Sequence, residues 1–141
     1  MKARVNWVEN VMFVAESDSG HAIVLDGAPE GGGRNMGMRP MELMALSVGS
    51  CSSYDILTIL KKAKQSVTAC EAEVTAQRVD GTPAVFESIH LHFKVTGFDL
   101  SEKHVRRAIE LSADKYCSAS IMMKNAGVKV SHDFEMHEAE K

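Results

Sequence analysis

With 141 residues, of which 45% are hydrophobic and 25% charged, the chain has the composition of one soluble globular domain spanning residues 1–141. A formal net charge of −3 argues against nucleic-acid binding, because proteins that neutralise phosphates carry a basic face or tail. Three cysteines without close pairing, and an N-terminus without an apolar leader, predict a reducing, cytoplasmic setting. A special role for a thiol is therefore expected to be chemical rather than structural.

The N-terminal part of the chain has the pattern of a three-stranded antiparallel meander. Asn10 and the run Asp18-Ser19-Gly20 are turn residues, and they separate short stretches of apolar and β-branched residues. These stretches are the predicted strands 2–8, 11–15 and 21–25. The glycine-rich segment 26–38 that follows is predicted to be a flexible connector, because its glycines match neither phosphate-binding motif.

A long, almost uncharged helix is predicted from Pro40 to Lys64. Proline suits the first helical position, and lysines suit the last turn because they complement the helix dipole. Between Leu43 and Leu60 the only formal charge is Asp55, so burial on all sides is expected. Serines and a threonine within this run argue against membrane insertion. One sheet cannot cover such a helix, which predicts either strong sheet curvature or a second subunit, and we favour a homodimer.

Two strands follow the helix. The strand 70–77 places Cys70 on its apolar face, where a free cysteine is expected to pack as a small hydrophobe. The strand 88–95 places His90 and His92 together on its polar face. The sequence offers no further metal ligands at suitable spacing, so solvated histidines are favoured over a metal site.

A second helix is predicted to begin at Asp99, with Glu102 as its capping-box partner. The i, i+4 spacing of its apolar residues places Cys117 on the core-facing stripe, and Arg106 is expected to pair with Glu110 on the outer face. A short or kinked helix over 118–125 and a strand from Val128 to Met136 complete an α+β chain of order βββ-α-ββ-α(α)-β.

Two cysteines, Cys51 and Cys117, lie on predicted helices and are both expected to face inward. Serines flank Cys51 on both sides, which indicates a polar pocket rather than a plain apolar core. A thiol becomes reactive when a cation or a helix N-terminus lowers its pKa, and Cys51 lies about three turns into its helix. An arginine is therefore needed, and the polar residues just upstream are Arg34, Arg39 and Glu42.

The segment Pro40-Met41-Glu42-Leu-Met-Ala-Leu-Ser-Val-Gly-Ser-Cys51, with Lys115-Tyr116-Cys117-Ser118 downstream, resembles the OsmC/Ohr family. This family comprises the osmotically inducible and organic hydroperoxide resistance proteins, and the resemblance is nearest to its short OsmC-like branch. The resemblance extends to the order of strands and helices along nearly the whole chain. It implies strongly curved antiparallel sheets around a long buried central helix, in an intertwined homodimer.

The same resemblance implies a thiol-dependent peroxidase acting on organic hydroperoxides at the subunit interface. Cys51 would attack the peroxide O–O bond and become a sulfenic acid, and Cys117 would condense with it to a disulfide. An external dithiol would then reduce this disulfide. Neither a metal nor a flavin would be required.

The supporting residues of the family are displaced in this sequence. The family's glutamate, which orients an arginine over the thiolate, directly follows the proline, where this chain has Met41. Glu42 lies one residue further, about 100° round the helix. Glu42 and Arg39 are the predicted catalytic pair, with Arg34 or Arg4 as alternatives for the arginine. The displacement also leaves an alternative function open, a non-enzymatic dimer that binds a small apolar ligand or senses redox state.

Overall fold

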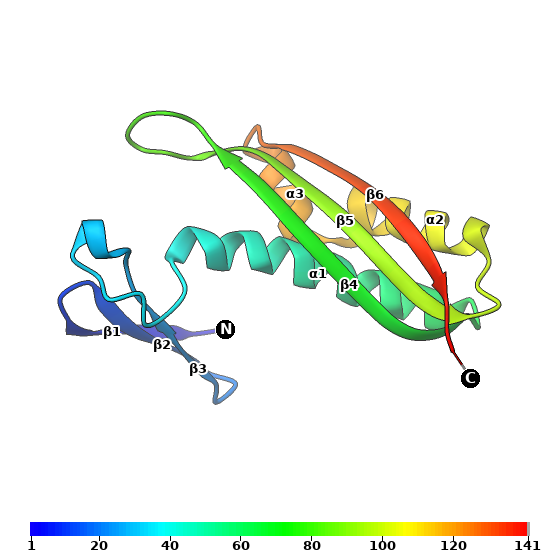
Figure 1. Ribbon diagram of the computed structural model, residues 1–141, viewed down its shortest axis with the longest axis horizontal. Helices are drawn as coiled ribbons and strands as arrows, with labels where there is room; N and C mark the ends of the chain where they lie inside the picture. The colour runs from blue at the N-terminus through cyan, green and yellow to red at the C-terminus, as the bar shows by residue number, and fades with distance from the viewer. Residues whose placement is uncertain (141) are drawn as a thin grey trace. The chain divides into compact units, whose positions relative to one another are not determined.

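The computed structural model describes residues 1–140 and shows an α+β chain with two three-stranded sheets (Figure 1). The strands and helices follow the predicted order. The chain divides into two compact units, residues 1–44 and the part from Ala45 onward. Helix α1 (Pro40–Lys62) starts in the first unit and continues into the second, with proline at its first position as predicted.

The first unit is the predicted antiparallel meander. Its strands pair in the order β1-β2-β3, and Asn10 adopts a left-handed φ of 48° in the first turn. The strands are β1 (Ala3–Glu9), β2 (Met12–Ser17) and β3 (Ala22–Leu25). A short 3-10 helix, Pro29–Gly31, lies within the connector that follows.

A buried aspartate organises this connector, which the sequence predicted to be flexible. The carboxylate of Asp26 accepts hydrogen bonds from the backbone N–H groups of Gly27, Arg34 and Met36, at 2.7, 3.1 and 3.0 Å. The bond from Met36 contributes most to lowering the pKa of Asp26. Gly33 lies so close to Gly27 that a Cβ would stand 2.0 Å from the Gly27 carbonyl oxygen. The connector is therefore a defined loop.

The second unit contains a mixed sheet in the order β4-β5-β6. Strands β4 (Ser66–Arg78) and β5 (Phe86–Phe98) pair antiparallel, but β6 (Lys129–Glu138) lies parallel to β5. The expectation of wholly antiparallel sheets is wrong here. The segment between β5 and β6 holds two helices, and such a crossover returns the chain to the starting end of β5.

The crossover is the predicted helix with a break. Helix α2 (Glu102–Leu111) passes into a π-helical turn, Ser112–Tyr116, and helix α3 (Ser118–Asn125) follows. The predicted capping box is wrong, because Ser101 is the N-cap, without a side-chain bond, and Asp99 has a left-handed φ of 50°. Arg106 pairs with Glu102 at 2.5 Å rather than with Glu110.

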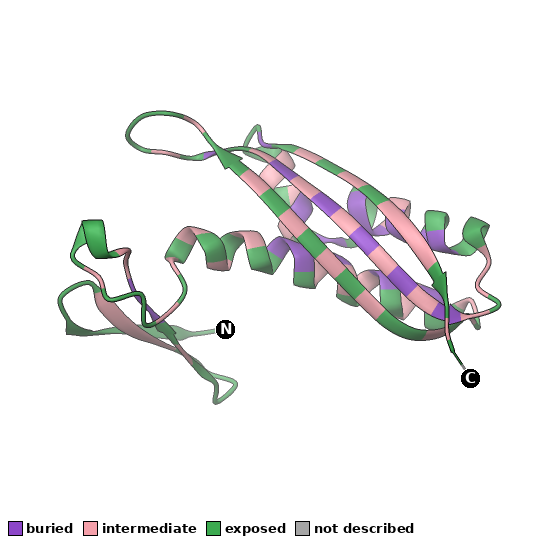
Figure 2. Cartoon of the chain, viewed as in Figure 1, coloured by how far each residue is buried: buried purple, intermediate pink, exposed green. Residues whose placement is uncertain are grey.

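The core of this unit lies between the sheet and the helices that cover one of its faces (Figures 1 and 2). Alternate residues of β5 are buried as the period-two pattern predicted: Ile89, Leu91, Phe93 and Val95. Helix α1 contributes Val48, Ile56 and Leu60. Gly49 allows this helix to lie close to β4, because a Cβ there would stand 2.6 Å from Cγ2 of Val74.

Helix α1 is not buried on all sides within one chain. Its buried residues lie on one side (Figure 2), and large apolar side chains away from that side are exposed. Three of them lie in the second unit, Leu46 (48% exposed), Tyr54 (73%) and Leu57 (41%). Among residues 1–140, α1 alone has the length and composition to cross a membrane, a criterion that core helices of soluble proteins also meet. The exposed stripe is the surface that the expected second subunit would cover.

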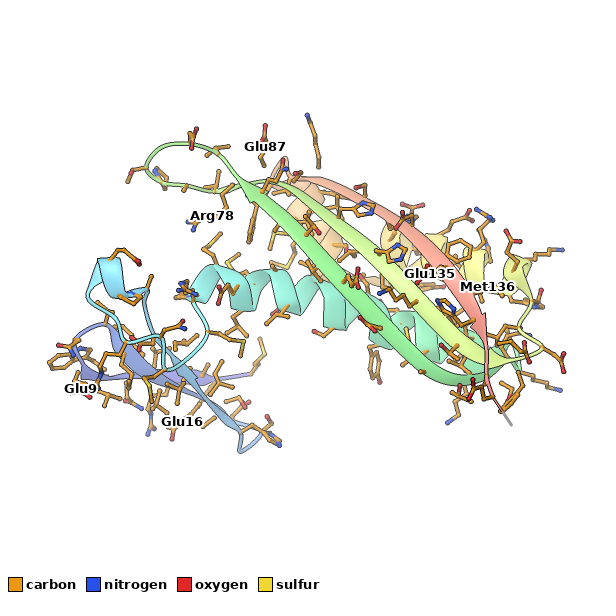
Figure 3. All side chains as sticks on the ribbon, in the orientation of Figure 1. Glu9, Glu16, Arg78, Glu87, Glu135 and Met136 are labelled. Atoms are coloured by element: carbon orange, nitrogen blue, oxygen red, sulfur yellow. The ribbon has the colours of Figure 1, made fainter. Side chains whose placement is uncertain are left out.

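The outer face of the second sheet carries paired histidines. Nδ1 of His92 and Nε2 of His90 lie 2.6 and 3.2 Å from Oδ1 of Asp133 on the neighbouring strand. Glu135, labelled in Figure 3, continues the row and lies 3.0 Å from Nε2 of His137. The histidines predicted to be solvated are partly exposed, and both hydrogen-bond to the one Asp133 carboxylate that parallel pairing brings alongside them.

This pairing predicts a pH-dependent contribution to stability. The hydrogen bond with Asp133 raises the pKa of His92 above 6.5, and the bond from His92 lowers the pKa of Asp133 below 3.8. The stabilisation is lost as pH rises through the raised pKa of His92, and as pH falls through the lowered pKa of Asp133. Asp133→Asn is therefore expected to lower the urea midpoint most between about pH 4 and about pH 6.5. Glu87→Gln is the matched control, and an Asp133→Asn loss that persists unchanged to about pH 9 would contradict the linkage.

Candidate active site

Cys51 and Cys117 lie side by side in the second unit. Their Sγ atoms and a carboxylate oxygen of Asp55 all lie within 4.8 Å of one another, a group that we call the thiol–carboxylate cluster. Cys51 is half-buried on α1, whereas Cys117 has no exposed surface. The two thiols that the sequence placed facing inward are thus brought together, one accessible and one enclosed.

The π-helical turn positions Cys117. The chain changes direction after Tyr116, and Cys117 adopts an extended backbone with φ −70° and ψ 99°. Cys117 is therefore the N-cap of α3 rather than a residue on the stripe of one continuous helix. Its Sγ accepts a hydrogen bond from the backbone N–H of Ser120 at 3.4 Å, the contact expected of an N-cap side chain.

Both sulfurs face the first turn of α3. The backbone N–H of Ala119 hydrogen-bonds to Cys51, and that of Ser120 to Cys117. These N–H groups have no partner within their own helix, and the positive end of the helix dipole lies at the same place. The arrangement favours negative charge on sulfur.

Three buried serines hold Cys117 against α1. The hydroxyl of Ser52 donates to Sγ of Cys117 at 3.1 Å and lies 3.2 Å from the hydroxyl of Ser120. The hydroxyl of Ser112 donates to the Ser52 carbonyl oxygen at 3.2 Å. The sequence indicated Ser52 only as a polar neighbour of Cys51, and Ser112 and Ser120 were missed. Their spacing, five before and three after Cys117, is meaningful only once the bend at Cys117 is known.

Asp55 is the third member of the cluster and was not predicted as a site residue. It lies four residues after Cys51, on the same face of α1. Its Oδ2 is buried and has no hydrogen-bond partner among residues 1–140, and burial raises the pKa of Asp55. Two signals in the sequence could have found it, its status as the single charge in the apolar run and its i+4 position.

The two thiols differ in their readiness to ionise. Burial raises the pKa of Cys51, and the nearby Cys117 and Asp55 raise it further against the Ala119 N–H bond. Burial also opposes ionisation of Cys117, but hydrogen bonds from Ser120, Ser52 and Cys51 outweigh it and hold the Cys117 pKa below its usual range. Cys117 is therefore the better-stabilised thiolate, and Cys51 is the sulfur that solvent reaches.

The predicted activating residues pair with each other in the first unit. The backbone N–H of Arg39 donates to Glu42 at 2.9 Å and its guanidinium donates at 3.0 Å, which fixes the first turn of α1. The backbone bond contributes most to lowering the pKa of Glu42. Arg34 pairs with Glu9, and Arg4 is exposed on β1. The largest contributions to the Cys51 pKa come from burial, from Ala119 of α3, and from Cys117 and Asp55.

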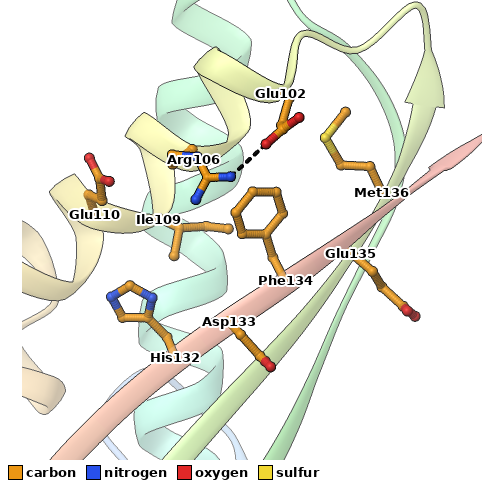
Figure 4. A pocket seen from close by; sticks show the side chains of 9 residues that line it. All are labelled: Glu102, Arg106, Ile109, Glu110, His132, Asp133, Phe134, Glu135 and Met136. Carbon is orange, nitrogen blue, oxygen red and sulfur yellow. Dashed lines mark hydrogen bonds and ion pairs between the residues drawn. The ribbon is translucent and has the colours of Figure 1, made fainter.

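A hollow of about 430 Å³ lies elsewhere in the second unit, between α2 and β6 (Figure 4). The guanidinium of Arg106 stands 5.1 Å from the ring centroid of Phe134 inside it, while also pairing with Glu102. No member of the thiol–carboxylate cluster lines this hollow. Its lining consists of charged residues of α2 and of residues of the edge strand β6.

Comparisons with known proteins agree with this architecture. Protein YhfA of Escherichia coli K12 is 43% identical over 139 residues, which is 96% of this chain and 98% of the relative. A hypothetical protein from Aquifex aeolicus VF5, 28% identical, superposes with a TM-score of 0.79 over 96% of both chains.

A further solved structure, an organic hydroperoxide resistance protein OsmC from Legionella pneumophila, is 18% identical and shares the fold with a TM-score of 0.70 over 98% of this chain and 96% of its own. A model of the family described as OsmC-like protein matches residues 31–133, a span that runs from the glycine-rich connector through both cysteines to the final strand. By sequence and by fold, this chain belongs to the OsmC-like protein family.

Proposed function

We propose that the protein is a thiol-dependent peroxidase that reduces organic hydroperoxides in the cytoplasm, using Cys51 and Cys117. The observation that carries the proposal is the pair of sulfurs within 4.8 Å, one half-exposed and one enclosed by hydrogen-bond donors. The Legionella pneumophila relative of the same fold is named for organic hydroperoxide resistance, which supports this substrate class. Three free cysteines suit a reducing compartment.

In the first step Cys51 attacks the peroxide. The thiol of Cys51 hydrogen-bonds to the sulfur of Cys117, which is ionised more readily and accepts the Cys51 proton as the attack proceeds. The Cys51 thiolate attacks the outer oxygen of ROOH, the O–O bond breaks, and the leaving alkoxide takes the proton held by Cys117 to give ROH. Sulfur is oxidised by two electrons to the sulfenic acid, and the peroxide is reduced by two.

In the second step Cys117 resolves the intermediate. Its thiolate, having given the proton to the alkoxide, attacks the sulfenic sulfur of Cys51, the S–O bond breaks, and hydroxide leaves and takes a proton from solvent to become water. The two sulfurs lie within 4.8 Å of each other, and they have to approach to about 2.05 Å to form the disulfide bond. Cys51 lies on a regular helix and Cys117 at a bend between helices, so movement at the bend is expected to close this gap. An external dithiol then restores both thiols by exchange.

The proposal includes a homodimer with the activating cation near the subunit interface. The exposed apolar stripe of α1 needs a cover, as do the exposed Val5 and Trp7 of β1. Both sheets also have unpaired edge strands, and the edge strand β4 is 13 residues long. An edge strand of this length, if left exposed, would favour uncontrolled pairing with strands of other chains. We assign Arg39, positioned by Glu42, as the cation that stabilises the Cys51 thiolate, with Arg34 and Arg4 as the alternatives.

The test is loss of free thiol after one equivalent of cumene hydroperoxide. Wild type and Cys70→Ser are expected to lose both Cys51 and Cys117 thiols, whereas Cys51→Ser is expected to retain Cys117 as a thiol. Cys70 is the matched control because burial also raises its pKa, yet it lies outside the cluster. Thiol loss in wild type no faster than that of free glutathione would contradict the peroxidase.

A second candidate function is a non-enzymatic dimer that binds a small apolar ligand or senses redox state. Two observations favour it. Glu42 already holds Arg39 in a local pair at the helix start, and the pKa of Cys51 is raised rather than lowered. This alternative predicts an apolar molecule retained in native mass spectrometry, together with thiols as slow as glutathione.

A further inference from the structure

The thiol–carboxylate cluster also has the composition of a metal site. Cys51, Cys117 and Asp55 each offer one ligand atom, and these three atoms all lie within 4.8 Å of one another. A zinc ion with bonds of about 2.0–2.3 Å sets tetrahedral ligands roughly 3.3–3.8 Å apart. Closing the cluster on an ion thus requires shifts of roughly 1 Å, which are within the reach of side-chain rotation.

A missing partner for Asp55 points to a cation. Its Oδ2 is buried and has no hydrogen-bond partner among the described residues, an expensive condition for a polar atom. Asp55 also lies within 4.8 Å of two ionisable sulfurs. A divalent cation stabilises three potential anions this close together more effectively than the two N–H groups of α3 do.

We infer that Cys51, Cys117 and Asp55 of the reduced protein bind one thiophilic divalent cation, of which Zn²⁺ is the best fit. Two thiolates select zinc over Mg²⁺ or Ca²⁺, which prefer oxygen ligands. Three protein ligands leave a fourth position open for water, the arrangement of a catalytic rather than a closed structural site. Binding releases the thiol protons, and the Ser52 and Ser120 hydrogen bonds to Cys117 orient that ligand.

The bound ion would compete with peroxide chemistry, a consequence that rests on the proposed function. Both sulfur nucleophiles are occupied in the metal complex, so peroxide reduction is expected to slow. Oxidation to the disulfide removes both thiolates and frees the ion. The zinc-bound dithiolate, one hydroperoxide and two protons give the disulfide, free Zn²⁺, the alcohol and water, with two electrons passing from sulfur to oxygen.

The inference is tested with Co²⁺ as a spectroscopic probe on the reduced, metal-free full chain under anaerobic conditions. We expect one Co²⁺ per chain, with thiolate-to-cobalt charge-transfer bands and the d–d bands of a tetrahedral ion, displaced by Zn²⁺. Cys51→Ser and Cys117→Ser are expected to weaken or abolish the charge-transfer bands, whereas Cys70→Ser is expected to keep them. Absence of the bands in wild type, or their persistence at full intensity in both serine variants, would overturn the site.

Asp55→Asn decides whether the carboxylate is a ligand. Loss of outer-sphere partners weakens metal sites by about 10- to 100-fold, so loss of this direct ligand is expected to weaken Zn²⁺ binding by at least about 10-fold. An unchanged affinity would show that the dithiol binds alone and would overturn the three-ligand proposal. Peroxide reduction by the metal-free protein is measured separately, so a failed peroxidase and a failed metal site give different results.

Discussion

The Cys117→Ser protein is expected to reduce about one equivalent of hydroperoxide per chain and then to lose steady turnover by at least about 100-fold. Cys51 still presents a half-exposed sulfur, so the first oxidation to the sulfenic acid still occurs, although more slowly at neutral pH because the Cys117 base is missing. Resolution fails because the second sulfur, held within 4.8 Å in the wild type, is missing. An external dithiol must then attack in a bimolecular step, without the advantage of a nucleophile held in place. Peroxide consumption followed by trapping of the sulfenic acid with dimedone measures both phases.

Two further variants test the first step separately from the resolving step. Cys51→Ser is expected to abolish the first equivalent as well, because Cys117 has no exposed surface and Cys70 lies outside the cluster. Ser52→Ala removes a hydrogen bond to the Cys117 sulfur without removing either thiol, and it is expected to slow the first step at neutral pH. Raising the pH should restore that step, because ionisation then no longer depends on the hydroxyl. Wild-type turnover in Cys117→Ser would contradict the resolving role.

Local patterns in the sequence were sufficient for most of the elements. The alternation of Ile89, Leu91 and Phe93 predicted both strand β5 and its buried face, since side-chain direction in a strand depends only on local periodicity. The start of α1 at Pro40 was predicted for a similarly local reason, because the proline ring is already set for a first helical position.

What the sequence missed depends on contacts between distant segments. The parallel pairing of β6 with β5 places Asp133 beside His90 and His92, about forty residues away in the chain. Contacts between paired strands do not affect the periodic pattern of residues within either strand, so the sequence does not reveal them. The two histidines are partly exposed as predicted, but the carboxylate that they share was not predicted.

In the candidate site too, some features were predictable from local sequence and others depend on contacts between distant segments. Cys51 and Cys117 could be identified from residue type and helical context, but the backbone N–H donors to their sulfurs come from the bend at Cys117. That bend follows a π-helical turn, which propensity does not distinguish from an ordinary helix end. Asp55 was visible as an isolated charge, yet its orphaned oxygen appears only when the helix is packed.

Leu57→Glu is expected to convert the protein from a dimer to a monomer of 15.4 kDa in sedimentation velocity. Leu57 is 41% exposed on the apolar stripe of α1, so the substitution is expected to change the stability of a single chain by at most about 0.5 kcal/mol. In a two-fold dimer the new carboxylate is buried twice. At about 3 kcal/mol for each unpaired buried charge, the dimer loses roughly 6 kcal/mol, or about 10⁴-fold in Kd.

The matched control is Lys103→Glu, which makes the same final residue at an exposed position on α2 and is expected to remain dimeric. A Leu57→Glu protein that remains a dimer at micromolar concentration would contradict the assignment of this stripe to the interface. The monomer also separates two parts of the site, because Cys51 and Cys117 come from one chain. Its disulfide should still form with a diffusible thiol oxidant such as diamide. Peroxide reduction should fall, since the activating cation is assigned to the subunit interface, and an unchanged peroxide rate would place that cation within the same chain.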